Sequence, residues 1–540
     1  MKIESHNLNF EIRIYHSVVF MGFLLLELLG GCGGGTALIP AEKPVTTSQK
    51  TPELVSVEPE NNATTVKRNA SVVLNFSEPM DALTLTVNSG NTQCSGTIQI
   101  SSNSFSNCVR MNPPELKDGD KKVVLSPKGI YATQKFHQIR LTTEIKTVSG
   151  TSLNKRITTN PGFRTTWSQQ IGTPGDDTGF ALAVDPDGNV YLAGNTSTSE
   201  SRDESDLFLA KYAASGFQNW IQQPGFGRSV TAAVLQLKKS GQLRLSGYSQ
   251  EDDSSAVILA SYDLSGKKIF SKTITLTGRA SGKGMAMDPE GNIYIPAEVP
   301  FNLMKIRKTG EQIWSNELSS GLRLRALAAD TEFSLYLTGS IEQSLDGNKS
   351  KGGSDIFLLK MYQMGPKRWS RTFGTPLDES GTALALQSDK AIAIVGYVTQ
   401  AENGSEDKRE YHDAFVIKYD SEGKQQWSYV IKGTKTEQST VALWTPQGNL
   451  LVGGYTESSL ETQSHSGKED VFLAKLDSGG ELLWLRQFGT KENERPLGIA
   501  LGTEGQIYVT GFTEAQMDGA KYSGGRDVFL VQFNKDGEKQ

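Results

Sequence analysis

Bulky aromatic residues recur at regular intervals through the last two thirds of the chain. The spacings run from 44 residues, between Phe270 and Trp314, to 58 residues, between Trp369 and Trp427. A period of this size is typical of arrays in which each repeat is one supersecondary unit, so it constrains the fold before any local motif does. We therefore expect seven copies of one unit from Trp167 to the end of the chain. The series is Trp167, Trp220, Phe270, Trp314, Trp369, Trp427 and Trp484, and only Trp444 falls outside it.

Each unit has the pattern of four short strands. In the first unit, two apolar segments, residues 180–184 and 190–194, flank an Asp-Gly turn that is typical of a tight hairpin. The strand with the aromatic residue is the fourth. We interpret the repeated Asp as fixing a turn and the tryptophans as packing between units, rather than as ligand groups. The third strand has an Asp-x-Phe core in five units, at Asp206, Asp355, Asp413, Asp470 and Asp527.

The series opens on a lone strand and ends on an incomplete unit. Residues 166–171 form the lone strand, and the last unit has three strands at residues 497–501, 506–511 and 527–533. We expect the first strand to complete the last blade, because closing a ring of blades removes exposed sheet edges.

The order of an aromatic strand, an Asp-x-x-Gly-Asn-x-Tyr hairpin at residues 185–191 and an Asp-x-Phe strand resembles the SBBP family of β-propeller repeats. The resemblance is weakest in units two and three, which have Ser261 and Lys305 near the end of the third strand. It implies an all-β fold with a seven-bladed β-propeller at residues 165–540. Four antiparallel strands in about 50 residues is also the content of one blade.

Residues 52–164 have a different pattern of short strands with period-two alternation, which favours a small β-sandwich. The segment Phe76-Ser77-Glu78-Pro79-Met80-Asp81 resembles a strand end of bacterial Ig-like domains. This resemblance implies an Ig-like β-sandwich that acts as a spacer or an adhesive module. Fold alone does not assign its function.

The N-terminal residues resemble a bacterial lipoprotein signal peptide. An apolar run, residues 18–29, is followed by Gly30-Gly31-Cys32, as in a lipobox. The run is shorter than the roughly 20 residues of a membrane-spanning helix. The resemblance implies a signal peptide at residues 1–31, lipidation of Cys32 and a flexible tether through residue 51. The anchor places the protein in the bacterial envelope, as an outer-membrane lipoprotein that faces the periplasm or the cell surface.

Two further cysteines form a candidate disulfide. Cys94 and Cys108 are 14 residues apart, a separation compatible with neighbouring strands, and export to an oxidising compartment would favour their pairing. Two unrelated buried thiols are the alternative.

Charge and motifs exclude several classes of function. The net charge is −5 without a basic block, which argues against a nucleic-acid partner. The histidines His137, His412 and His465 have no metal-site spacing, so we expect no catalytic motif, no metal and no cofactor. The acidic pairs at residues 176–177 and 378–379 do not match a calcium loop, and we interpret them as solvated turns.

Two functions remain. The first is a non-catalytic binding or scaffold module, adhesive or involved in envelope assembly, with a protein or glycan partner at the face of the long polar loops. The alternative is a propeller hydrolase or lyase with its site in the central channel. The long loops are residues 195–205, 399–412, 456–469 and 513–526.

Overall fold

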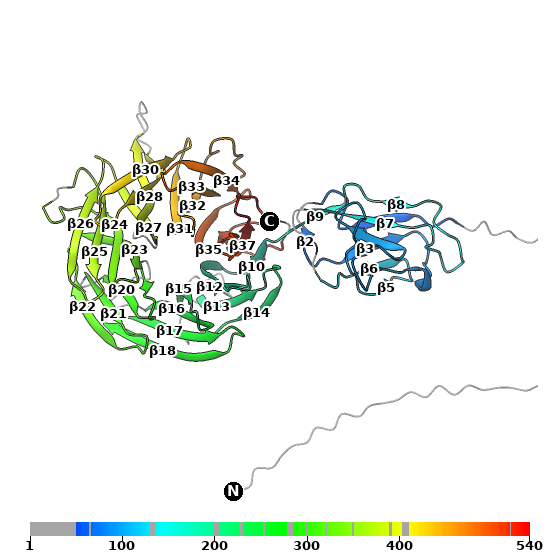
Figure 1. Cartoon of the computed structure of the whole chain (residues 1–540), viewed down its shortest axis with the longest axis horizontal. Coiled ribbons are helices and arrows are strands. Elements are labelled where there is room, and N and C mark those ends of the chain that lie inside the picture. The colour runs from blue at the N-terminus through cyan, green and yellow to red at the C-terminus, as the bar shows by residue number, and fades with distance from the viewer. Residues whose placement is uncertain are drawn as a thin grey trace, which may run out of the picture. The chain divides into compact units, whose positions relative to one another are not determined.

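The structure is a computed structural model of the chain (Figure 1). It describes residues 50–540 except 64–65, 130, 132–134, 198–204, 226–229, 252–253, 278–283, 299–300, 320, 348–349, 388–390, 402–409 and 519. The expected signal peptide, Cys32 and all but the last two residues of the tether lie outside the described residues. A helix with the length and apolarity needed to cross a membrane does not occur among the residues that are described.

Residues 54–166 form two sheets around a shared apolar core. The strand β3 alternates buried and half-buried residues, with Val72, Leu74 and Phe76 buried. Cys94 and Cys108 are joined by a disulfide, and their Cα atoms are 4.8 Å apart. The first sheet has the order β1 (Leu54–Glu58), β3 (Val72–Phe76), β6 (Lys122–Leu125), β5 (Glu115–Lys117), and the second β2 (Val66–Lys67), β9 (Phe163–Thr166), β7 (Phe136–Leu141), β4 (Ile98–Ser101), with β8 (Ile157–Thr158) on β7 and a 3-10 turn η1 (Ala82–Thr84) between β3 and β4.

In the described part of residues 167–540, seven four-stranded antiparallel sheets follow the repeat. Blades one to three are β11 (Thr178–Val184), β12 (Val190–Ser197), β13 (Ser205–Tyr212), β14 (Gln218–Gln222); β15 (Thr231–Leu237), β16 (Gln242–Glu251), β17 (Ser254–Asp263), β18 (Lys268–Thr277); and β19 (Ala286–Met287), β20 (Ile293–Glu298), β21 (Phe301–Ile306), β22 (Gln312–Glu317). Blades four to six are β23 (Leu322–Ala329), β24 (Ser334–Ile341), β25 (Asp355–Tyr362), β26 (Lys367–Phe373); β27 (Glu379–Leu386), β28 (Ile392–Ala401), β29 (Glu410–Tyr419), β30 (Gln425–Ile431); and β31 (Glu437–Trp444), β32 (Leu450–Thr456), β33 (Asp470–Leu476), β34 (Leu482–Phe488). Blade seven is β35 (Glu494–Leu501), β36 (Ile507–Thr513), β37 (Asp527–Phe533) and β10 (Gln169–Ile171).

The ring closes as the sequence predicts. The strand β10 lies beside β37 (Figure 1) and pairs antiparallel with it. In this pairing Gln170 lies opposite Phe529. Trp167 precedes this strand rather than belonging to it, and its side chain is fully buried. Its indole Nε1 donates a hydrogen bond to the Ala214 carbonyl in the next blade, at 2.9 Å. One strand from the start of the repeats therefore ties blade seven to blade one.

The first strands of the blades form the inner ring. Each of them contacts the first strand of both neighbouring blades, in the closed cycle β11, β15, β19, β23, β27, β31, β35. The second strands are almost entirely buried; every residue of β12, β24 and β32 is buried. The first strands are less buried than the second strands, with half-buried residues in β11, β31 and β35. This arrangement places a channel at the centre of the propeller.

Candidate binding site in the central channel

Six inner strands carry a β-bulge at the same position. In the described part of each of these strands, one residue is inserted into the pairing with the second strand. A bulge re-aims the side chain of the extra residue and is common at the rims of closed sheets and beside binding sites. The inserted residues are Phe180, Ala233, Arg325, Thr382, Thr440 and Leu497.

These six residues line one cavity. Its volume is about 660 Å³, and it lies in the central channel where the inner strands begin. The second strands contribute Tyr248 and Tyr397, and the inner strands also contribute Ser380 and Gln438. A cavity of this size falls in the range of small-molecule sites, which is about 300–1,000 Å³. We call it the bulge-ring cavity.

The bulge-ring cavity combines one cation with hydroxyl, amide and aromatic groups. Arg325 is exposed in it, and none of the described ion pairs involves its guanidinium. The hydroxyl of Ser380 is buried without a hydrogen-bond partner among the described residues. The Gln438 amide nitrogen lies 3.3 Å from Nδ1 of His412, whose ring packs 4.3 Å from that of Tyr397. Such a lining can bind a polar or anionic group through hydrogen bonds and the guanidinium.

The two threonines of the bulge ring also hold neighbouring blades together. The Thr382 hydroxyl donates to the Ser439 carbonyl and the Thr440 hydroxyl to the Pro496 carbonyl, both at 2.5 Å. Each bond crosses from one blade to the next. Their hydroxyl protons are therefore used within the scaffold, so that toward a ligand these hydroxyls can act only as hydrogen-bond acceptors.

The carboxylates nearest the bulge-ring cavity point away from it. Ser380 and Thr382 line the cavity, so Glu379 lies on the opposite face of β27 and is buried between blades. Glu437 and Glu494 occupy the matching position in blades six and seven and are both fully buried. No carboxylate is among the described residues that line the cavity.

Threonine and glycine residues hold these acids. The Thr490 backbone N–H and hydroxyl each donate to the Glu494 carboxylate at 2.6 Å, and the Thr513 hydroxyl donates to it at 2.7 Å. Burial raises the pKa of Glu494 and of Glu437, and a neighbouring carboxylate, Asp470 or Asp413, raises each pKa further. These acids stabilise turns at the blade interfaces through their bonds to the backbone.

The expectation that the acidic pairs are solvated turns is wrong for two residues. Asp177 and Glu379 are buried, and each accepts hydrogen bonds from the threonine four residues earlier. A signal was present in the sequence, because a Gly-Thr pair precedes a Glu or Asp in four units. The pairs stand at residues 172–173, 374–375, 433–434 and 489–490. Groups of three or more potential metal ligands were not found among the described residues.

The repeated Asp of the third strand acts on a turn, as interpreted from the sequence. Asp470 and Asp527 are fully buried and accept backbone hydrogen bonds from Ser466 and Ser523, at 2.8 and 2.9 Å.

The expected loop 399–412 is wrong at both ends, because β28 extends to Ala401 and β29 begins at Glu410. The middle of that loop, and most of loop 195–205, lie outside the described residues. The bulge ring was not predicted from the sequence, because one inserted residue hardly changes the period of a strand.

These features define the class of protein: a seven-bladed β-propeller that follows a small two-sheet β domain. Residues 166–199 match the β-propeller repeat family SBBP, and residues 48–167 match a bacterial Ig-like domain family. The expected resemblances to SBBP repeats and to bacterial Ig-like domains are confirmed by these matches, and the fold is nearly all β.

Individual relatives are more distant. The regulatory protein FlaEY of Caulobacter vibrioides is 29% identical over 206 residues, which are 34% of this chain and 22% of that protein. The chain thus spans under a quarter of this relative. A streptogramin B lyase structure is 12% identical with a TM-score of 0.41 and covers 68% of this chain and 97% of its own. Virginiamycin B lyase from Staphylococcus aureus is 13% identical with a TM-score of 0.37, and the match covers 67% of this chain and 98% of the lyase chain.

Proposed function

We propose that this protein is a lipid-anchored envelope protein whose propeller is a non-catalytic binding module. Its partner is a glycan or a protein segment that enters the loop end of the central channel. The Ig-like domain serves as a spacer between the anchor at Cys32 and the propeller. The proposal combines a sequence-based expectation for the anchor with a site built from described residues.

The observation that carries the proposal is the bulge ring. One structural position is repeated in six described inner strands, yet it holds an aromatic, two aliphatic, one cationic and two hydroxyl side chains. The backbone bulge is common to the six described strands whereas the side chains on it differ, so the side chains are not what maintains the bulge. The variety supports recognition of an asymmetric partner, with Arg325 as its charged contact.

The orientation of the buried carboxylates favours binding over acid–base catalysis by a carboxylate. Such catalysis requires the carboxylate within hydrogen-bond reach of the substrate. Glu379 and Glu437 face the blade interfaces, whereas their neighbours Ser380 and Gln438 face the cavity. The groups that line the cavity are suited to hold a ligand in place.

The test uses the mature protein, residues 32–540, on arrays of glycans and matrix proteins. We expect a saturable partner whose affinity falls at least tenfold in Arg325→Gln. The matched control is Arg323→Gln, two residues away on β23, where the side chain is exposed and paired with Glu342 at 2.7 Å. Equal losses in both variants would contradict the assignment to the bulge-ring cavity.

Two further measurements separate the related proposals. Recovery of the bound glycan unchanged after long incubation supports a binding module, whereas cleavage products would establish the hydrolase or lyase alternative. Protease treatment of intact cells distinguishes an adhesin on the surface from a scaffold in the periplasm, since only the surface protein is digested.

A further inference from the structure

A repeated contact fills the space between neighbouring blades. The third strand supplies a lysine and the fourth strand a tryptophan directly opposite it, as in the pair Lys418 and Trp427. Both side chains reach the turn between the third and fourth strands of the next blade. The Lys418 ammonium and the Trp427 indole N–H donate to the same carbonyl, that of Ser478, at 3.1 and 2.9 Å. We call this contact the lysine–tryptophan clasp.

Parts of the clasp recur around the ring, although the indole nitrogens of Trp220 and Trp369 are buried without a hydrogen-bond partner among the described residues. Lys360 of blade four donates to the Ser421 carbonyl of blade five at 2.9 Å, and Trp369 lies against Gly423 of the same turn. Trp314 of blade three donates to the Gln363 carbonyl of blade four at 3.0 Å. The opposed lysine–tryptophan pairs within the described blades are Lys211 and Trp220, Lys305 and Trp314, Lys360 and Trp369, Lys418 and Trp427, Lys475 and Trp484.

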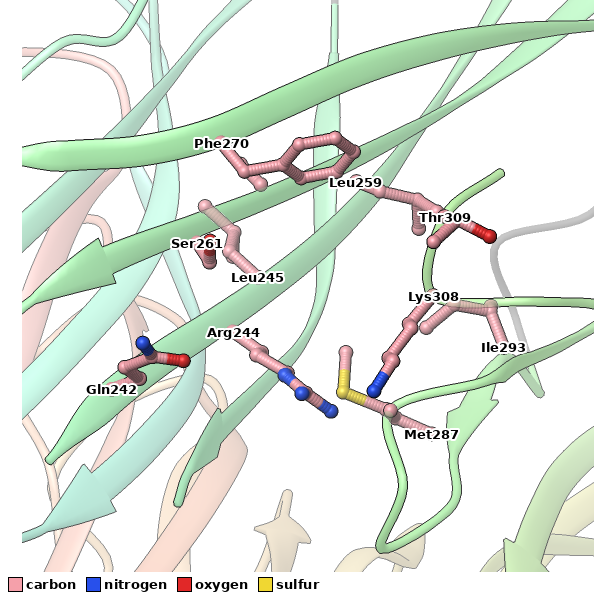
Figure 2. Close-up of a pocket in the computed structure, with 12 residues that line it drawn as sticks. Gln242, Arg244, Leu245, Leu259, Ser261, Phe270, Met287, Ile293, Lys308 and Thr309 are labelled. Atoms are coloured by element: carbon pink, nitrogen blue, oxygen red, sulfur yellow. The ribbon is translucent and has the colours of Figure 1, made fainter. Parts of the chain in front are cut away.

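Blade two breaks the pattern. Ser261 stands opposite Phe270 at the positions of the lysine and the tryptophan. The serine hydroxyl is too short to reach the next turn, and the phenylalanine ring has no N–H to donate. A cavity of about 220 Å³ opens there between blades two and three, and both residues line it (Figure 2). The replacement of lysine and tryptophan by Ser261 and Phe270 in unit two is therefore accompanied by a cavity at this interface.

The lining of this interblade cavity combines apolar side chains with two cations. Leu245, Leu259 and Phe270 contribute the apolar surface, together with Met287 and Ile293. Figure 2 shows the side chains of Arg244 and Lys308 converging beside Met287, from different blades.

The charge at this cavity is not balanced by its own lining. The Arg244 guanidinium donates to the backbone carbonyl of Glu290. No ion pair of Arg244 or Lys308 is found among the described residues, and no described carboxylate lines the cavity. The nearby Asp288 is engaged with Lys305, at 3.7 Å. Two cations beside an apolar cavity are complementary to a ligand with one anionic and one apolar end.

We propose that the interblade cavity is a binding site for a small carboxylate with an aromatic or short aliphatic body. The apolar body packs against Leu259 and Phe270, and the carboxylate meets Arg244 and Lys308. The size agrees, because an apolar cavity of about 150 Å³ already takes up benzene. The site lies outside the bulge-ring cavity and goes beyond the proposed function, since it needs no macromolecular partner.

Calorimetric titration of the mature protein with phenylacetate tests the site. We expect one saturable site per chain, and binding at least tenfold weaker for uncharged phenylacetamide. Arg244→Gln with Lys308→Gln should weaken phenylacetate at least tenfold, whereas Lys267→Gln, a change at an exposed lysine that does not line the cavity, should leave it unchanged. Equal affinity for phenylacetate and phenylacetamide would overturn the proposed anion site, and the cavity would then be only a gap in the packing between the blades.

A second variant keeps the test independent of folding. Ser261→Lys with Phe270→Trp rebuilds the clasp and fills the cavity, so it should abolish phenylacetate binding while the melting temperature stays the same or rises. Undiminished binding in this variant, or no binding by the parent protein, would overturn the proposal. Partner binding at the bulge-ring cavity should persist in the filled variant. The two proposed sites can therefore be tested independently of each other.

Discussion

Removing the last strand of blade seven should unfold the propeller as a whole. The strand β37 pairs with β36 on one side and with β10 on the other, and all seven of its residues are buried. Deleting residues 527–540 leaves β36 with an unpaired edge and β10 without a partner. Since β10 comes from the start of the repeats, the deletion also cuts the link between blade seven and blade one.

The size of the effect follows from the side chains that are lost. Five apolar residues of β37 are buried, each at 2% exposure or less: Val528, Phe529, Leu530, Val531 and Phe533. Burial of such a side chain contributes about 1.5–3 kcal/mol, so the strand contributes roughly 8–15 kcal/mol. That is as large as the whole stability of a typical folded domain, about 5–15 kcal/mol. We therefore expect no folded ring.

Thermal melting followed by circular dichroism measures this outcome. The deletion should remove the cooperative transition of the propeller. Leu530→Ala is a milder change to the same strand that should lower the free energy of unfolding by about 2–5 kcal/mol. Its matched control is Leu358→Ala, which removes an equally buried leucine from the third strand of blade four. A deletion protein that melts cooperatively near the temperature of the parent would refute closure by β10.

Three further predictions concern pH, the disulfide and the anchor. Burial raises the pKa of Glu437 and Glu494, so the stability that these protonated acids contribute is full below about pH 4.3 and is lost as the pH rises through their pKa values in the folded protein. The propeller should therefore have a higher melting temperature at pH 5 than at pH 8, and Glu437→Gln should reduce this dependence of the melting temperature on pH. Burial lowers the pKa of His137 to about 4, so the N-terminal sheets should lose stability as the pH falls from about 6.5 toward 4, and an unchanged melting temperature there would contradict this. Cys94→Ser with Cys108→Ser should cost about 3 kcal/mol in denaturant unfolding of the same sheets, given a loop of 14 residues. Cys32→Ser should abolish incorporation of labelled fatty acid, and retained label would disprove lipidation at that residue.

The sequence predicts the blades well because the spacing of the aromatic residues marks where each blade ends. Trp427 and most of its counterparts pack against a turn of the next blade, so their spacing counts blades directly. The closure by residues 166–171 follows from counting strands, since three strands at the end and one at the start make a blade. Only the start of that strand differs, at Gln169.

The candidate site was harder to predict for a physical reason. A bulge adds one residue to a strand of seven or eight, and alternation of apolar residues resumes after it, so Arg325 looks like any exposed strand residue. The repeats do hold a signal when they are aligned, because the residue before an Ala-Leu-Ala segment is Phe180, Arg325 or Thr382 in three units. The buried acids were misjudged because polarity was taken for exposure, although a threonine four residues earlier provides their bonds.

Both candidate sites occur where a blade departs from its neighbours. At the bulge position, the backbone contact is the same in each of the six described strands and the side chain is free to vary. At Ser261 and Phe270, the side chains that normally close the interface are replaced, yet the third and fourth strands of blade two keep the antiparallel pairing and the register shift that other blades have at this position. A ring of seven interfaces tolerates one weakened contact, because the others and the closing strand hold it in place. The replaced pair at Ser261 and Phe270 is thus a position where a cavity forms while the blades keep their strands.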